Sequence, residues 1–496
     1  MELGGRIDAP KQRGFLVLAV AVAIGLALRL AVVQVPRCIN TDGVYFVQLT
    51  EQIAAGGSWF HPTVAITPGY SALIVAIHAV LGGSFEQIAC YLSVFSGALA
   101  IISAWFVWRR FFGEEAAGFS CLLLAVGPLS VQYGSGVFYE PLSLLGLITG
   151  FALWVRLEKG GSWIWGGGVG LCWGAVAWMK PEVLLWSALG GIVTARRQLR
   201  VGILLVGVTG LIYLPYILMV HEHTGKWQIA TKQGVNLLVA QATGEADFGA
   251  KLEQLREAGA QGLEKGSLPG AVALVRRAAI NIYLVHRYAI RESWPPILLA
   301  MVAIGMFLAW RGRLLGAWLW FPMLTALPLL VFLLETRVWY TIFVMVSGVA
   351  GLAIAQAERW RRWLLVIVSL SFLLPEALRP LYRLDADAAE HQAGIWLKAN
   401  ARGNISVMDR KPFVAYYAGL PQIWPPAQSG LEGLKGCLQG FESVVLVVDN
   451  RYFKSSRPEW FDALSCLPPW LREIAHFDGP EGHRVRLLLY ARGEES

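Results

Sequence analysis

Long apolar runs separated by short polar links fill about the first three quarters of the chain. The first run covers roughly residues 15–35, and a helix that crosses a bilayer needs about 20 apolar residues. The pattern therefore predicts a mainly α-helical, polytopic membrane protein with about eleven transmembrane helices. The further predicted spans lie at about 85–107, 116–131, 141–155, 163–178, 183–194, 201–220, 296–310, 314–334, 338–355 and 363–374.

Basic residues in the polar links set the expected orientation, because cytoplasmic links of membrane proteins carry an excess of lysine and arginine. The decisive segment is the apolar run TPGYSALIVAIHAVLGG, which begins at Thr67. If this run does not span, every arginine-rich link falls on one side of the membrane; if it spans, the bias breaks after the first helix. We therefore expect the run to lie on the outer membrane surface, the N-terminus in the cytoplasm and the C-terminus outside.

Two long loops and a distinct C-terminal segment interrupt the apolar pattern. Both loops, 36–84 and 221–292, fall on the outer side of the predicted transmembrane module 1–380. In residues 381–496 helical and strand patterns alternate: AAEHQAGIWLKANA predicts a helix, and NISVMD, FESVVLVVD and HRVRLLLY predict strands. This alternation predicts a small α/β domain outside the membrane.

Composition supports the membrane assignment. The 496 residues are 56% hydrophobic and 15% charged, whereas soluble domains carry about 25% charged residues. The net charge of +8 comes from basic residues between the spans, so we expect no nucleic-acid partner. The first run lacks a small-residue cleavage site and is predicted to be an uncleaved span. Among six cysteines there is no CxxC pair, and Cys437 and Cys466 could form a disulfide if the tail is exported, or stay unpaired.

Ionisable residues gather at the predicted outer ends of the spans. A charge at the middle of a membrane costs roughly 2.5–3.5 kcal/mol, so such groups tend to pair or to line a wet cavity. We expect carboxylates and cations from four outer links, together with the second loop, to converge on one cavity. They are Asp42 in the first outer loop, Glu140 in GVFYEP, Lys180 in MKPE, Glu335 and Arg337 in LETRVWY, and Arg287 and Arg291 in the second long loop.

Each of these residues also has an ordinary structural interpretation. Asp42 in NTDG could serve a turn or a helix cap, and Glu140 before Pro141 could be an exposed helix start. Lys180 could extend its ammonium toward the interface, and Arg337 could pair with its neighbour Glu335. Arg29, inside the first span, could likewise extend toward the interface or face the cavity.

The succession NTDGVYFVQLTEQIAAGG, TPGYSALIVAI, VFYEP, MKPEVLL and ETRVWY resembles the membrane-embedded GT-C glycosyltransferases. It is most similar to bacterial relatives of protein O-mannosyltransferases and of the lipid A aminoarabinose and galacturonic acid transferases. The resemblance covers about residues 10–375, and the tail is similar to the outer α/β domain that many such relatives carry. It implies a GT-C fold in the bacterial cytoplasmic membrane, with the C-terminal domain on the periplasmic side.

The resemblance also implies a reaction and residue roles. Enzymes of this kind transfer a sugar from a polyprenyl-phosphate donor to an acceptor on the outer face of the membrane. Their catalytic base in the first outer loop maps to Asp42, and a second acidic residue maps to Glu140. Lys180 matches the lysine of the KP turn, and an Arg-Tyr pair maps to Arg337 and Tyr340. This sequence has Asp-Gly in the first loop where many relatives have two adjacent acids.

The residue types fit this chemistry independently. A hydroxyl acceptor needs a base, and a carboxylate within about 3 Å can serve. The phosphate leaving group is already anionic and needs cations, which Lys180, Arg337, Arg287 or Arg291 could supply. One base without a carboxylate nucleophile predicts inversion at the anomeric carbon, in contrast to double-displacement glycosidases.

Two other functions remain open at this point. One is a flippase or transporter for a lipid-linked glycan, although no internal repeat is evident and the polar residues lie at outer ends rather than at the midplane. The other is an outer-face glycan polymerase or ligase with a diphosphate-linked donor. The expected partners are the lipid donor, membrane lipids and an acceptor that is a lipid, a glycan or a protein. A single Asp and a distant Glu form a poor divalent site, so we expect no metal or other cofactor.

Overall fold

The computed structural model describes residues 11–61, 66–157, 162–229, 296–311, 336–382, 385–425, 430–456 and 458–492. Among these, the chain separates into two compact units. One unit holds the described residues before position 35 and those between 49 and 381; the other holds Val35–Gln48 together with Tyr382 and the residues after it. The predicted span at 314–334 and the second long loop from residue 230 onward lie outside the described residues.

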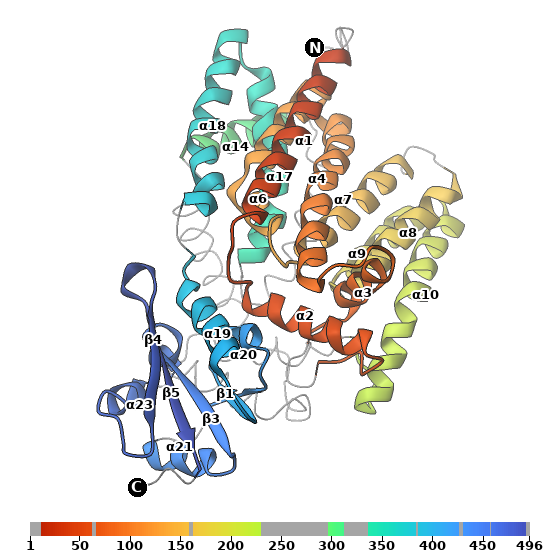
Figure 1. The fold of residues 1–496 in the computed structure, drawn as a ribbon. Coiled ribbons are helices and arrows are strands. Elements are labelled where there is room, and N and C mark those ends of the chain that lie inside the picture. Colours follow the sequence, from red (N-terminus) through yellow and green to blue (C-terminus); the bar gives the residue numbers. More distant parts are fainter. Residues whose placement is uncertain are drawn as a thin grey trace, which may run out of the picture. The chain divides into compact units, whose positions relative to one another are not determined.

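The first unit consists of helices that follow one another along the chain (Figure 1). The helix α2 (Thr41–Ala54) begins in the second unit and ends in the first. The others are α1 (Lys11–Val33), α3 (Gly69–Leu81), α4 (Phe85–Phe112), α5 (Glu114–Val126), α6 (Pro128–Tyr133), α7 (Glu140–Leu157), α8 (Trp163–Ala177), α9 (Val183–Ala195), α10 (Leu199–Thr224), α14 (Pro296–Arg311), α17 (Thr336–Gln356) and α18 (Arg359–Tyr382).

Five of the described helices are long and apolar enough to cross a membrane: α1, α4, α7, α10 and α18. Shorter apolar helices, among them α8, α9 and α14, accompany them. This confirms the predicted polytopic helical membrane protein. The TPGY run forms α3, which has 13 residues and is shorter than the roughly 20 needed to span. Its place on the outer surface stays a prediction.

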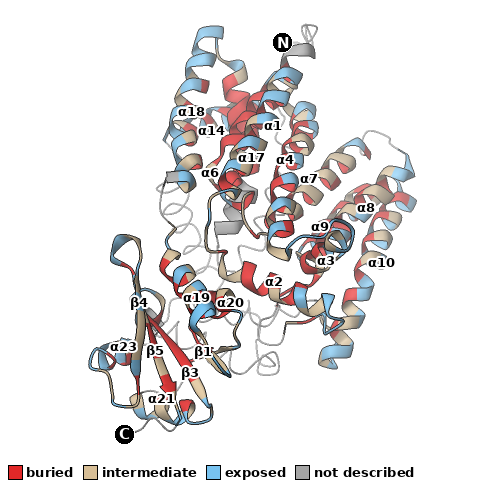
Figure 2. Cartoon of the chain, in the orientation of Figure 1, coloured by how far each residue is buried: buried red, intermediate tan, exposed pale blue. Residues whose placement is uncertain are grey.

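The helices pack mainly against near neighbours in sequence. The helix α1 packs on α4 and α5, α4 on α7, and α8 on α10, around a large apolar core. By contrast, α10 exposes several large aliphatic residues. The exposed parts of this helix are pale blue in Figure 2. Exposed apolar residues on a long helix suit contact with lipid chains. They include Leu199, Ile203, Leu211, Leu214 and Leu218.

Arg29 differs from the sequence prediction. It neither reaches the interface nor lines an open cavity, because its exposed fraction is 0%. Its guanidinium donates to Gly25 O at 2.6 Å and to Ser130 Oγ at 2.6 Å. A buried arginine in an apolar helix requires such acceptors. Arg29 therefore ties α1 to the segment between α5 and α7.

The C-terminal domain contains a five-stranded mixed sheet in the order β2-β1-β3-β5-β4. The strands β2, β1 and β3 are parallel, and β5 runs antiparallel to β3 and β4. The strands are β1 (Ile405–Met408), β2 (Gln422–Ile423), β3 (Ser443–Asp449), β4 (Arg472–Asp478) and β5 (Arg484–Ala491). The helices are α19 (Ala388–Asn400), α20 (Phe413–Ala418), α21 (Leu431–Leu438), α22 (Tyr452–Ser456) and α23 (Pro458–Ala463), with a 3-10 turn at Pro480–Gly482.

Helices cover both faces of this sheet (Figure 1). Val445 and Val447 of β3 pack on the side of α19 and α20, whereas Val444, Leu446 and Val448 pack on the side of α21 and α23. A strand that is buried on both faces reads as a continuous apolar run, which explains the SVVLVVD sequence of β3.

Candidate active site

The segment before α2 is held within the second unit by three side chains of the C-terminal domain. The Cys38 N–H donates to Asp385 Oδ2 at 2.5 Å. The Ile39 N–H donates to Tyr417 Oη at 2.9 Å, and Lys411 Nζ donates to Thr41 Oγ1 at 3.3 Å. Cys38 and Ile39 lie in neither a helix nor a strand, so their backbone N–H groups need such side-chain partners.

Asp42 lies in the first turn of α2 and is half-buried. Asn40 caps this helix, because its Oδ1 accepts the Gly43 N–H at 2.8 Å. The capping role that the sequence allowed for Asp42 therefore belongs to Asn40. A carboxylate in the first turn of a helix is stabilised by the positive end of the helix dipole. Asp42 thus occupies a place that suits a negative charge.

Glu140 and Lys180 lie in the first unit. Glu140 begins α7 and is only 3% exposed, so it is not the exposed helix start that was one interpretation of the sequence. Lys180 follows α8 in the turn before α9, and its Nζ lies 5.7 Å from the ring centroid of Tyr139. The structure therefore brings the MKPE turn next to the residue that precedes Glu140.

The start of the TPGY helix α3 contacts the same turn. Thr67 Oγ1 donates to Met179 O at 3.1 Å. A Cβ added at Gly69 would lie 2.8 Å from Trp178 O, so a larger residue cannot approach the end of α8 this closely. The glycine of TPGY is therefore required by a close contact between backbones.

A second link joins α3 to the VFYEP segment through α4. Tyr70 Oη bonds to Ala89 O at 3.0 Å, and Ser93 Oγ donates to Phe138 O at 2.7 Å. Tyr70 and Ser93 themselves lie 3.3 Å apart, oxygen to oxygen. The sequences TPGY, VFYEP and MKPE, far apart in the chain, thus meet in one region of the first unit.

The other predicted phosphate-binding residues are not placed as side chains. Arg337 and Tyr340 belong to the first turns of α17, where only the backbone is described. Arg287, Arg291 and Glu335 lie outside the described residues. Convergence of all the predicted residues on one cavity therefore stays a prediction.

The sequence interpretation missed the residues of the C-terminal domain that hold the Asp42 segment. Lys411 lies two residues after Asp409, the first residue past β1. The Asp409 carboxylate accepts the Lys411 N–H at 3.0 Å and the N–H of Val414, in the first turn of α20, at 3.1 Å. Burial raises the pKa of Asp409 well above its usual value. An acidic and a basic residue directly after a buried parallel strand are a usable sequence signal, because ligands of open α/β sheets bind at that edge.

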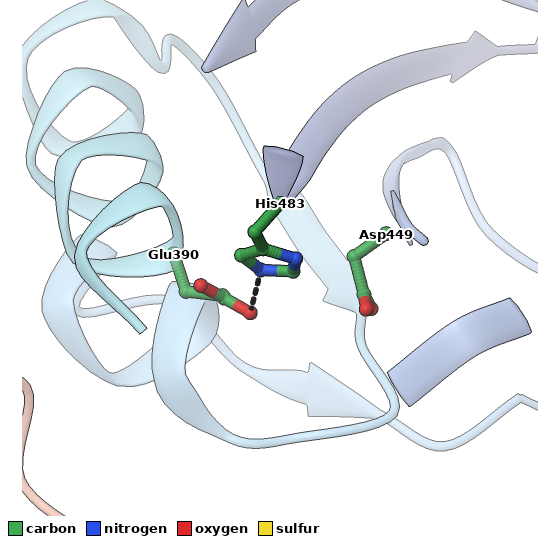
Figure 3. Close-up of side chains that lie close together, drawn as sticks. All are labelled: Glu390, Asp449 and His483. Carbon is green, nitrogen blue, oxygen red and sulfur yellow. Dashed lines mark hydrogen bonds and ion pairs between the residues drawn. The ribbon is translucent and has the colours of Figure 1, made fainter. Parts of the chain in front are cut away.

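A buried histidine pairs with a carboxylate in the same domain (Figure 3). His483 Nε2 lies 2.7 Å from Glu390 Oε1, and Nδ1 lies 3.0 Å from Asn450 Oδ1. The Asn450 amide donates to Gly482 O through Nδ2, so its Oδ1 is the acceptor and His483 Nδ1 donates. One proton is therefore shared between Nε2 and Glu390. The hydrogen bond to Glu390 raises the pKa of His483, and burial raises the pKa of Glu390.

Glu390, Asp449 and His483 are the one group of three or more potential metal ligands within 4.8 Å among the described residues. The 2.7 Å contact between Glu390 and His483 has the length of a charge-assisted hydrogen bond. Asp449 accepts backbone N–H groups of Arg451, Tyr452 and Phe453 at the start of α22. These contacts give each side chain a structural role in the domain. The expectation that the protein needs no metal stays a prediction.

No family model and no curated protein matches the chain, but solved structures do. The apo crystal structure of the Archaeoglobus fulgidus oligosaccharyltransferase superposes with a TM-score of 0.61 at 14% identity, over 89% of this chain and 70% of that chain. The complex of the same organism's oligosaccharyltransferase AglB with an inhibitory peptide and a dolichol-phosphate has a TM-score of 0.55 at 12% identity, over 95% of this chain and 74% of that chain. ArnT from Cupriavidus metallidurans in the apo state has a TM-score of 0.48 at 14% identity, over 96% of this chain and 97% of that chain. The archaeal likeness confirms the GT-C fold that the sequence resemblance implies.

Proposed function

We propose that the chain is a membrane glycosyltransferase that moves a sugar from a polyprenyl-phosphate donor to an acceptor on the outer face of the cytoplasmic membrane. The fold carries this proposal, because a similar structure that matches 95% of the chain is an oligosaccharyltransferase solved with a dolichol-phosphate. A lipid-linked donor also fits a chain whose polar candidates lie at the ends of apolar helices.

Asp42 is the proposed general base. It accepts the proton of the acceptor hydroxyl while the oxygen attacks the anomeric carbon and the bond from that carbon to the phosphate oxygen breaks. Asp42 ends neutral, and the polyprenyl phosphate leaves with one more negative charge than the donor carried. Proton transfer to a positioned base contributes typically 10²–10⁴-fold. A single displacement of this kind inverts the anomeric configuration.

The charge that develops on the phosphate requires cations. Lys180 is the described candidate, and its place over the Tyr139 ring keeps the ammonium beside the VFYEP segment. We propose that Arg337, Tyr340, Arg287 and Arg291 complete the phosphate site. Glu140 is the proposed second acidic residue of the catalytic site, at the start of α7, where the helix dipole favours a negative charge.

The acceptor is a lipid, a glycan or a protein, and the C-terminal domain is proposed to lie on the periplasmic side. We propose no metal in the reaction, because the candidate acidic residues Asp42 and Glu140 come from separate segments. The phosphate leaving group is also already anionic, so lysine and arginine side chains can stabilise it.

A transfer assay with purified protein in lipid nanodiscs tests the proposal. Defined polyprenyl-phosphate sugars, polyprenyl-diphosphate glycans and a no-donor control are each offered with extracted envelope acceptors, with and without a chelator. We expect sugar transfer from the monophosphate donor alone and no loss on chelation. Transfer only from the diphosphate donor indicates a polymerase or ligase. Lipid translocation in vesicles without any transfer contradicts a glycosyltransferase and indicates a flippase.

A further inference from the structure

The contacts to residues 38–41 come from two neighbouring parts of the C-terminal domain. Asp385 lies just before α19, Lys411 lies in the link between β1 and α20, and Tyr417 lies in α20. Their partners, Cys38, Ile39 and Thr41, are the residues that lead into α2. Three hydrogen bonds therefore fix the stretch that ends one residue before Asp42.

The location of these contacts on the sheet is informative. The strand β1 continues through α20 to β2 on one side, and β3 lies on its other side, so the strand order reverses between β1 and β3. Open α/β sheets bind ligands at the carboxyl ends of the strands beside such a reversal. Lys411 follows the carboxyl end of β1. Here the domain uses this edge to hold a segment of its own chain.

The holding side chains are themselves fixed. Tyr417 packs edge-on against His391, with ring centroids 4.3 Å apart. Lys411 Nζ lies 5.0 Å from the centre of the Tyr452 ring, which limits the directions that its ammonium can take. The Ile39 side chain is only 7% exposed, so the segment is anchored by burial as well as by hydrogen bonds.

We propose that Asp385, Lys411 and Tyr417 are positioning residues that set the place of Asp42 for proton transfer; this inference rests on the proposed function. A base works only within about 2.6–3.2 Å of the proton that it takes. A displacement of about 1 Å away from the reacting groups can lower a rate about 100-fold. The C-terminal domain thus serves the reaction by holding the entry to α2.

Two conservative variants of the full-length protein test the inference. Tyr417→Phe removes the hydroxyl that accepts the Ile39 N–H. Asp385→Asn removes the negative charge of the side chain that accepts the Cys38 N–H. The matched control is Tyr452→Phe, which removes a hydroxyl that donates to Asp387 within the domain at 2.7 Å and keeps the aromatic ring under Lys411. Each protein is examined by hydrogen exchange of peptides covering residues 37–48 and β3, and by transfer kinetics.

We expect Tyr417→Phe to lower kcat about 5- to 10-fold, the equivalent of one lost hydrogen bond. The KM for the lipid donor should stay unchanged, and exchange should rise in residues 37–48 but not in β3. The double variant Tyr417→Phe/Asp385→Asn should lose about 100-fold in kcat. The control should keep the wild-type kcat and the wild-type exchange of residues 37–48.

The outcomes separate the two proposals. Faster exchange of residues 37–48 with wild-type kcat overturns the positioning role and leaves the proposed function standing. Unchanged exchange of residues 37–48 in the double variant also overturns it, because these contacts then do not hold the segment. A rise in KM without a fall in kcat does the same, since it indicates a role in donor binding. A wild-type protein that transfers no sugar from any polyprenyl-phosphate donor overturns the proposed function, and the positioning role that rests on it, before any variant is compared.

Discussion

Replacement of His483 by glutamine removes the imidazole, and with it the positive charge, that pairs with the deeply buried carboxylate of Glu390. Glu390 is 2% exposed, and its Oε1 lies 2.7 Å from His483 Nε2. Loss of one member of a buried charged pair costs about 3–5 kcal/mol, because the remaining charge is left uncompensated. We therefore expect the His483→Gln variant to lower the free energy of unfolding of the C-terminal domain by about 3–5 kcal/mol at neutral pH.

The same pair predicts how stability depends on pH. The pKa values of both His483 and Glu390 are raised above their ordinary values, so this pair binds more protons in the folded domain than in the unfolded chain. The contribution of His483 is fully present below about pH 6.5, the pKa of a histidine in the unfolded chain. It is lost as the pH rises through the folded pKa of His483. The free energy of unfolding should therefore fall from about pH 6.5 upward in the wild type, and this part of the slope should be absent from the variant.

Hydrogen exchange of the full-length protein in detergent measures this local stability, with peptides from β3 and β5 followed between pH 6 and 8 and corrected for intrinsic exchange rates. His476→Gln is the matched control, because His476 lies on β4 with a side chain that is 61% exposed. The double variant His483→Gln/Glu390→Gln leaves no buried charge at the pair and should recover most of the loss. A loss below about 1 kcal/mol, the size for a surface pair, refutes the reasoning, as does a double variant no more stable than the single one.

Two further predictions concern the first unit. Lys180→Met should lower kcat about 100-fold in steady-state transfer kinetics, because a cation that stabilises the leaving phosphate is lost. Lys180→Arg keeps the positive charge and should retain most of the wild-type kcat. A wild-type kcat in the methionine variant shows that Lys180 is not part of the phosphate site. Gly69→Ala places a methyl group 2.8 Å from Trp178 O and should cost about 1–3 kcal/mol, read as a lower thermal unfolding midpoint of the solubilised protein. Gly167→Ala is the control, because a Cβ added there meets no other atom within 4 Å, and equal midpoints of the two variants contradict the close contact at Gly69.

Hydropathy predicted the helical membrane unit, because lipid contact requires long apolar segments whatever the tertiary packing. In the tail, β1, β3 and β5 were predicted for a similar reason, since central strands buried on both faces form apolar runs. The edge strands β2 and β4 were missed. The former has two residues, and the latter, REIAHFD, carries charges and is mostly half-buried or exposed. Edge strands often carry charges, so no apolar pattern marks them.

The candidate site was predictable only in part. Asp42 was found because it is an ionisable residue in the outer loop that follows the first predicted span, and the structure places it in the first turn of α2. The residues that hold this segment, such as Tyr417, are separated from it by more than 300 positions in sequence, and no local pattern links such distant positions. The burial of Arg29 was missed for a related reason. Its acceptors Gly25 O and Ser130 Oγ are provided by the packing of helices rather than by composition.

The most direct test of the proposed function is sugar transfer by the Asp42→Asn variant, measured beside its binding of polyprenyl phosphate. The amide keeps the size of the side chain but cannot take a proton, so we expect transfer to fall about 10²–10⁴-fold with lipid binding unchanged. Glu51→Gln, which neutralises an exposed acid on the same helix, is the matched control and should keep wild-type transfer. An Asp42→Asn protein that inserts normally and transfers sugar at the wild-type rate contradicts the role of Asp42 as the base.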